Sequence, residues 1–105
     1  MNGAEAIAAE RARHSQLGYD RDHDMRHSRQ ELISAALCYT YAAQWAQFTN
    51  LSQPMPVWAR DNMAAWPWEE QYWKPSDNPQ RNLEKAGSFL AAEWDRLEQL
   101  RKDMA

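Results

Sequence analysis

A short polar segment in the first third of the chain carries residue types that bind metals. It reads DRDHD at residues 20–24, and His27 and Glu31 follow closely. Carboxylates and imidazoles at short spacing are common metal ligands. In a loop, the same residues also serve as solvated charges, as helix caps or as hydrogen-bond partners of a ligand. The sequence favours these latter roles over a metal site.

Two cations, Arg81 and Lys85, lie one turn apart at the start of the last predicted helix. The helix dipole disfavours positive charge at this end of a helix. Either Glu84 or an acidic loop residue neutralises them, or an external anion binds at the helix N-terminus. A surface salt-bridge network explains the same pattern, but such departures from local rules often mark functional sites.

The first predicted helix carries Arg11, Arg13 and His14. Arginine is well suited to bidentate recognition of phosphate or carboxylate. Glu5 and Glu10 on the same helix can pair with these residues. A solvated, salt-bridged face is therefore the default interpretation, and anion binding is the alternative.

Residues 66–75 read WPWEEQYWKP and hold three of the six tryptophans of the chain. Trp66, Trp68, Tyr72 and Trp73 could form a lid over the hydrophobic core. They could also line a pocket for a flat ring, since stacking on an aromatic side chain contributes about 1–3 kcal/mol per base. Both roles are open, and different rings of the segment can serve each of them.

Composition limits the classes of function. The net charge of -3 disfavours general nucleic-acid binding, which needs an electropositive surface. The only cysteine, Cys38, lies in an apolar run and is expected to be a buried small hydrophobe without a disulfide partner. No nucleophile elbow and no glycine-rich phosphate loop occurs in the sequence. We expect neither an enzyme nor a resident cofactor or metal.

The local patterns predict one small all-α domain over residues 1–105, with three main helices and a long aromatic connector. The first helix covers residues 4–16, and the second runs to about Phe48 after a capping box formed by Ser28 and Glu31. A short helix is expected within residues 57–65. The last helix starts after Asn78 as N-cap, with Pro79 in its first turn, and ends near Lys102.

Apolar residues of the last helix follow a three-four spacing, which predicts that this face docks on the core. The residues concerned are Leu83, Ala86, Leu90, Trp94, Leu97 and either Leu100 or Arg101. No apolar run approaches the length of a membrane span, and the N-terminal residues lack the order of a signal peptide. We therefore expect a cytoplasmic protein that does not bind membranes.

Three stretches together carry a resemblance to a known group. They read AERARHSQLGYDRDHDMRHSRQELISAALCY at 9–39, WPWEEQYWKP at 66–75 and QRNLEKAGSFLAAEWDRL at 80–97. The set resembles a small family of uncharacterised proteins that is common in phages and prophages. Met25 stands where that family has a second aspartate, which disfavours any role that needs two adjacent carboxylates.

A weaker resemblance is to the ryanodine-receptor repeat domain, a small helical module that can bind adenine nucleotides. Gly18, Tyr19, His23, Asp24 and Lys85 fall in comparable places. Bacterial anti-phage systems signal with NAD-derived and cyclic nucleotides, and phages encode small proteins that sequester them. The two resemblances together imply such a role for this chain.

The leading hypothesis is a phage-encoded protein that binds a nucleotide-type ligand between the 18–24 loop, the first helix and the aromatic connector. Tryptophans would stack on the base, cations would bind phosphates, and the loop would hydrogen-bond the ribose or base edge. The residues expected to do so are Arg11, Tyr19, His23, Asp24, Trp66, Trp68, Trp73, Lys74, Arg81 and Lys85.

Two alternatives come from other classes. One is an all-α nucleotide pyrophosphohydrolase similar to MazG, with magnesium held by Glu10, residues 20–24 and Glu31. The other is an interaction module that inhibits a host defence enzyme through exposed aromatic residues, which are common in interface hot spots. Homo-oligomerisation is compatible with all three hypotheses.

Overall fold

The computed structural model describes residues 1–16, 30–48 and 53–105, and these residues form helices and connecting segments without any strand. The elements are α1 (Gly3–Gln16), α3 (Glu31–Phe48), α4 (Val57–Asp61), the 3-10 helix η1 (Glu70–Tyr72) and α5 (Pro79–Asp103). The predicted all-α class with three main helices is confirmed. No helix within these ranges is both long and apolar enough to cross a membrane.

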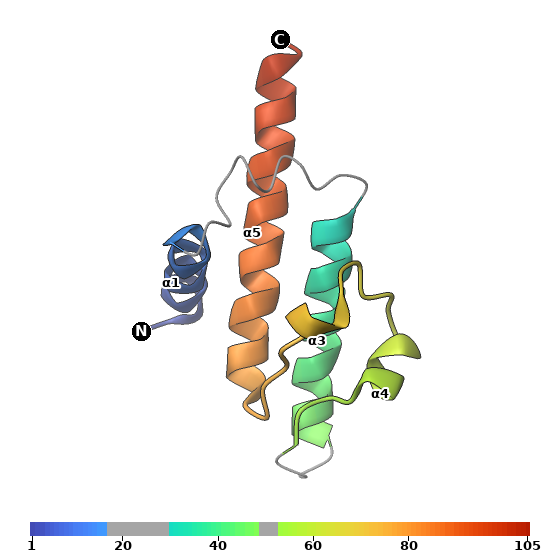
Figure 1. Ribbon diagram of the computed structural model, residues 1–105. Helices are drawn as coiled ribbons and strands as arrows, with labels where there is room; N and C mark the ends of the chain where they lie inside the picture. The colour runs from blue at the N-terminus through green and yellow to red at the C-terminus, as the bar shows by residue number, and fades with distance from the viewer. Residues whose placement is uncertain (17–29, 49–52) are drawn as a thin grey trace.

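The long helices α3 and α5 lie side by side and run in opposite directions, and α1 packs on the other side of α5 (Figure 1). The α3–α5 contact is close because small residues line it: Ala35, Ala36, Ala42 and Ala43 of α3 and Ala86 and Ala92 of α5 are buried. The connector between α4 and α5 folds back over α3 and supplies the large side chains that this alanine-rich contact lacks.

The start of α5 follows the sequence prediction. The side chain of Asn78 accepts a hydrogen bond from the backbone N–H of Gln80 at 2.9 Å, and Pro79 occupies the first turn. Asn82 is fully buried and exchanges two hydrogen bonds of 2.8 Å with the backbone of Ser76. These contacts fix the direction in which the connector enters α5.

The start of α3 could be compared with its prediction only in part, because Ser28 lies outside the described residues. The helix begins at Glu31, and Gln30 before it has a positive φ of 76°. The Glu31 carboxylate accepts a hydrogen bond from the indole N–H of Trp68 at 3.1 Å. Glu31 therefore joins α3 to the aromatic connector.

The predicted core face of α5 is wrong. Ala86 is buried, but Leu83, Leu90, Trp94, Leu97 and Leu100 are all exposed, as is Arg101. The side of α5 that faces α1 and α3 instead carries small residues and polar residues with partners, such as the Glu93–Arg96 ion pair. Close helix packing selects small residues, and the connector rings already fill the core volume.

Gly87 marks the point where α1 crosses α5. A Cβ atom at this position would lie 2.5 Å from Cδ1 and 2.6 Å from Cγ1 of Ile7. Such distances force the isoleucine to move, because carbon atoms pack at about 3.5–4.0 Å. The glycine is therefore required by the close approach of α1.

We predict that Gly87→Ala lowers the free energy of unfolding, although alanine is about 1 kcal/mol better than glycine within a helix. The clash with Ile7 should outweigh this gain, because overpacking costs about 1–3 kcal/mol. In an Ile7→Ala background the same substitution should stabilise the protein by about 1 kcal/mol. Urea denaturation of the wild type, the two single variants and the double variant measures these free energies of unfolding. An equal effect of Gly87→Ala in both backgrounds would contradict the close contact between Gly87 and Ile7.

Candidate functional site

Tyr39 of α3 lies at the centre of the aromatic cluster that the connector forms. Its ring centroid is 4.8 Å from that of Trp73, 5.8 Å from that of Trp66 and 5.9 Å from that of Phe89. Its hydroxyl accepts a hydrogen bond from the backbone N–H of Lys74 at 3.0 Å. Burial raises the pKa of Tyr39, so the phenol stays neutral at physiological pH. This residue fixes the end of the connector against α3.

The three connector tryptophans pack against one another and against Tyr39 and Phe89. Trp66 is 5.4 Å from Trp68 and 5.1 Å from Trp73, in both cases with nearly edge-to-face rings. The indole N–H of Trp66 donates to the backbone oxygen of Glu69 at 3.1 Å. Trp73 is buried, whereas Trp66 and Trp68 are half-buried. The core role is thus confirmed for Trp73, and ligand stacking stays a prediction for the other two.

Arg60 of α4 is a buried cation that sequence reasoning missed. It is 1% exposed, and its guanidinium carbon lies 5.2 Å from the ring centroid of Trp73 and 5.8 Å from that of Trp66. It donates two hydrogen bonds to Glu70, of 2.6 and 2.8 Å, and two to Asp61, of 2.7 and 3.0 Å. The only sequence signal is an arginine within an apolar segment that is followed by acidic residues.

A cluster of cations occupies the start of α5. We define the cation cluster as Arg13, Lys74, Arg81 and Lys85. Arg13 donates to the buried carboxylate of Glu10 at 3.0 Å, and Arg81 donates to the other oxygen of the same carboxylate. Three of the predicted site residues, Lys74, Arg81 and Lys85, are therefore brought together.

The cation cluster adjoins the aromatic cluster at Lys85. Its ammonium nitrogen lies 5.3 Å from the ring centroid of Tyr39 and donates to the backbone oxygen of Lys74 at 2.5 Å. Burial lowers the pKa of Lys85, and the nearby charge of Arg81 lowers it further. Glu10 and Glu84 both contact Arg81, the latter at 3.8 Å between the guanidinium nitrogen and a carboxylate oxygen.

Four predicted site residues remain: Arg11, Tyr19, His23 and Asp24. Arg11 lies 3.9 Å from Asp95 of α5. Tyr19, His23 and Asp24 lie outside the described residues, and so does the metal-site alternative at residues 20–24. Within the described ranges, no group of three histidine, cysteine or acidic side chains is arranged to hold a metal.

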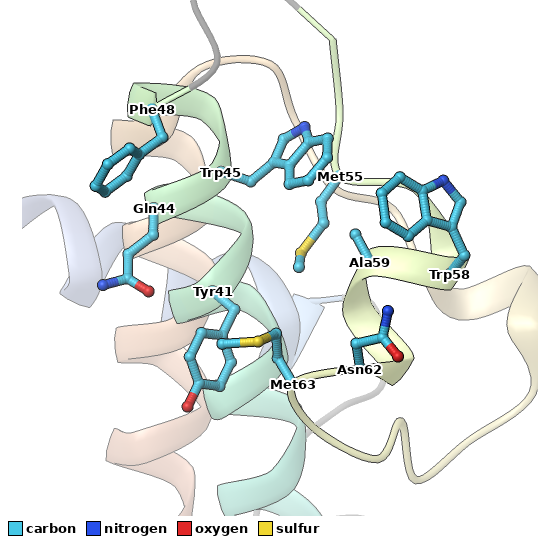
Figure 2. A pocket seen from close by; sticks show the side chains of 9 residues that line it. All are labelled: Tyr41, Gln44, Trp45, Phe48, Met55, Trp58, Ala59, Asn62 and Met63. Atoms are coloured by element: carbon cyan, nitrogen blue, oxygen red, sulfur yellow. The ribbon is translucent and has the colours of Figure 1, made fainter.

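A separate concave site lies between α3 and α4, at the end of α3 that is far from Glu31 (Figure 2). Its volume is about 340 Å³. The rings of Trp45 and Trp58 lie 5.7 Å apart at one side of it. The lining residues are Tyr41, Gln44, Trp45, Phe48, Met55, Trp58, Ala59, Asn62 and Met63. None of the residues predicted from the sequence lines this apolar pocket, because it depends on how α4 docks on α3.

The ion pair between Arg60 and Glu70 makes the stability of the fold depend on pH. The hydrogen bond from Arg60 lowers the pKa of Glu70 below its usual value of 4.5. A carboxylate with a lowered folded-state pKa stabilises the fold above its unfolded pKa, and this contribution disappears as the pH falls through the folded value.

We therefore predict that Glu70→Gln lowers the free energy of unfolding at pH 7. Its difference from the wild type should shrink as the pH falls below about 4.5, the ordinary value of a glutamate. The neighbouring exposed Glu69 provides the matched control, and Glu69→Gln should have little effect at either pH. Urea denaturation between pH 3 and pH 7 measures both differences. A pH-independent loss for Glu70→Gln would contradict the ion pair.

Comparisons with protein-family models, with curated proteins and with solved structures find no match to this chain. The functional assignment therefore depends on the geometry of the described residues.

Proposed function

We propose that the chain is a non-enzymatic binding protein for a small nucleotide-type anion. The observation that carries this proposal is the pairing of two arginines, Arg13 and Arg81, with the one buried carboxylate of Glu10 at the start of the longest helix. Burial lowers the pKa of the neighbouring Lys85, and the positive charges of Arg81, Arg13 and Lys74 lower it further, so these cations repel one another. A bound phosphate group would relieve this repulsion.

The local charge also contrasts with the chain as a whole, which carries a net charge of -3. A concentrated positive site in an acidic protein suits a compact anion better than an extended polyanion. Arginine supplies bidentate contacts to phosphate, and lysine supplies point charges. The start of α5 adds the positive end of a helix dipole.

Tyr39 supports a base-binding role for the neighbouring aromatic residues, because its ring contacts both Trp66 and the ammonium group of Lys85. We propose that half-buried Trp66 or Trp68 contacts the base, while Trp73 holds the connector in place. The proposed site also includes the 18–24 loop with Tyr19, His23 and Asp24, as expected from the sequence, whereas Arg11 is engaged near Asp95.

The resemblance to a phage family suggests the biological role. We propose that the protein acts in the cytoplasm of a bacterial host and sequesters a NAD-derived or cyclic nucleotide signal of anti-phage defence. Tight binding without turnover would be sufficient for this role, and rigid packing of the connector would reduce the entropy lost on binding.

A second candidate function is inhibition of a host defence enzyme through a protein contact. The apolar pocket between α3 and α4 favours it, because Trp58 stands exposed at its edge. Such pockets accept apolar or aromatic anchors of a partner protein.

The hydrolase alternative has less support. The carboxylate of Glu10 accepts hydrogen bonds from two arginines, and that of Glu31 accepts one from an indole. These carboxylate oxygens are the ones that magnesium would need as ligands.

We predict that calorimetric titration with ADP-ribose derivatives, cyclic dinucleotides and nucleoside triphosphates finds a ligand that binds without turnover. Lys74→Gln should weaken its binding about tenfold, since one charge-assisted hydrogen bond contributes about 1.5–3 kcal/mol. The side chain of Lys74 is exposed, so this variant should fold normally. Lys102→Gln removes the same charge at the exposed end of α5 and should bind like the wild type.

Two results would overturn the proposed function. Folded protein that binds no member of the panel would contradict it, and release of pyrophosphate would indicate the hydrolase alternative. If the protein instead retains a stoichiometric protein partner that is lost in Trp58→Ala, the second candidate function is favoured.

A further inference from the structure

The exposed side of α5 carries a continuous row of large apolar residues. We call it the α5 stripe: Leu83, Leu90, Trp94, Leu97, Leu100 and Met104. Their exposed fractions range from 37% for Leu100 to 87% for Met104. At 3.6 residues per turn, these positions fall on one side of the helix, and the row extends for about 30 Å along its axis.

The α5 stripe faces away from the described helices that pack on α5. Ala92 lies on the opposite side of α5 from Leu83 and Leu90 and is buried, and Gly87, beside the stripe, lies close to Ile7 of α1. In Figure 1 the C-terminal turns of α5 extend beyond the ends of both α1 and α3. Of the described elements, none therefore covers this face.

The size of the α5 stripe is sufficient for association. From the exposed fractions and the areas of such side chains, it presents on the order of 600 Å² of apolar surface. This is at the upper end of the largest patch found on a typical monomer, about 300–600 Å². Two copies that bury it together would remove about 1,200 Å², which is the lower limit for a stable, specific interface.

The α5 stripe is nearly symmetric about its midpoint, because large apolar residues lie at equal distances on both sides of it. Leu83 and Met104 lie equally far from the helix position between Glu93 and Trp94, and so do Leu90 and Leu97. An antiparallel pair of α5 helices would place each of these residues against an apolar residue of the second copy. Such self-complementarity is what a twofold interface requires.

The positive charge of Arg101 also favours the antiparallel orientation. Arg101 is exposed within the α5 stripe and pairs with Glu98 of its own helix. In a parallel, in-register pair, Arg101 would face its own copy, and the two like charges would repel. In the antiparallel pair the two Arg101 residues would instead lie about 20 Å apart along the helix axes. The dipoles of antiparallel helices also attract each other.

We propose that the α5 stripe is a homodimer interface in which two α5 helices pair in antiparallel orientation about a twofold axis near Trp94. The occupant of this face is thus a second copy of the chain. The interface leaves both the cation cluster and the apolar pocket between α3 and α4 outside it, so each dimer would carry two copies of each site.

Sedimentation velocity and light scattering test the dimer. At about 100 µM the wild type should have twice the chain mass of 12.3 kDa, and Trp94→Glu should have the monomer mass, because it buries a charge at the axis. Phe48→Glu is the matched control, since Phe48 is an exposed aromatic of α3 that lies outside the α5 stripe, and it should remain a dimer. Circular dichroism shows that each variant is folded.

A monomeric wild type at this concentration, or a folded Trp94→Glu protein that stays dimeric, would overturn the proposal. A dimer that dissociates only in Phe48→Glu would do the same and would place the interface at the apolar pocket.

Disulfide cross-linking of cysteine variants tests the antiparallel orientation of the two α5 helices. Oxidation of a mixture of Leu90→Cys and Leu97→Cys chains should give mainly the mixed disulfide, whereas either variant alone should cross-link poorly. Burial raises the pKa of the native Cys38 to about 11, so it should not interfere. Efficient cross-linking of Leu90→Cys with itself would overturn the antiparallel arrangement.

Discussion

The position of Tyr39 is the constraint on which the rest of the structure depends. Its ring lies between the aromatic residues of the connector and the ammonium group of Lys85, and its hydroxyl holds the backbone of Lys74. The connector carries Lys74 and leads into the helix that carries Arg81. The packing of one buried tyrosine therefore determines where the cations of the candidate site are placed.

Two buried charges fix the elements around Tyr39. Glu10 of α1 binds Arg81 of α5, and Arg60 of α4 binds Glu70 of η1. Removing one member of such a pair is costly because the buried member loses its partner, even where the pair itself adds little net stability. We interpret both pairs as devices that select one arrangement of α1, α4 and the connector around the α3–α5 pair.

Short sequence patterns correctly predicted the features that depend on neighbouring residues. The Asn78 cap, the turn that contains Pro79 and the limits of the long helices follow from short-range preferences. Longer-range features were predicted less well. Glu84 forms the expected ion pair with Arg81 at 3.8 Å, but the carboxylate that is hydrogen-bonded to Arg81 is that of Glu10, from another helix. Periodicity identifies an apolar face but does not show whether the rest of the chain covers it, which explains the error for the α5 stripe. Arg60 was missed because its burial depends on aromatic rings that are distant in sequence.

The central claim is that the cation cluster binds an anion while the buried aromatic residues hold the fold. Nuclear magnetic resonance of labelled protein, titrated with inorganic pyrophosphate and then with ADP-ribose, tests it most directly. We expect the backbone amide signals of Lys74, Arg81 and Lys85 to shift in a saturable manner with either ligand, while the indole N–H signal of buried Trp73 stays unchanged. Shifts confined to the apolar pocket around Trp58, or no saturable shift in the folded protein, would contradict the claim.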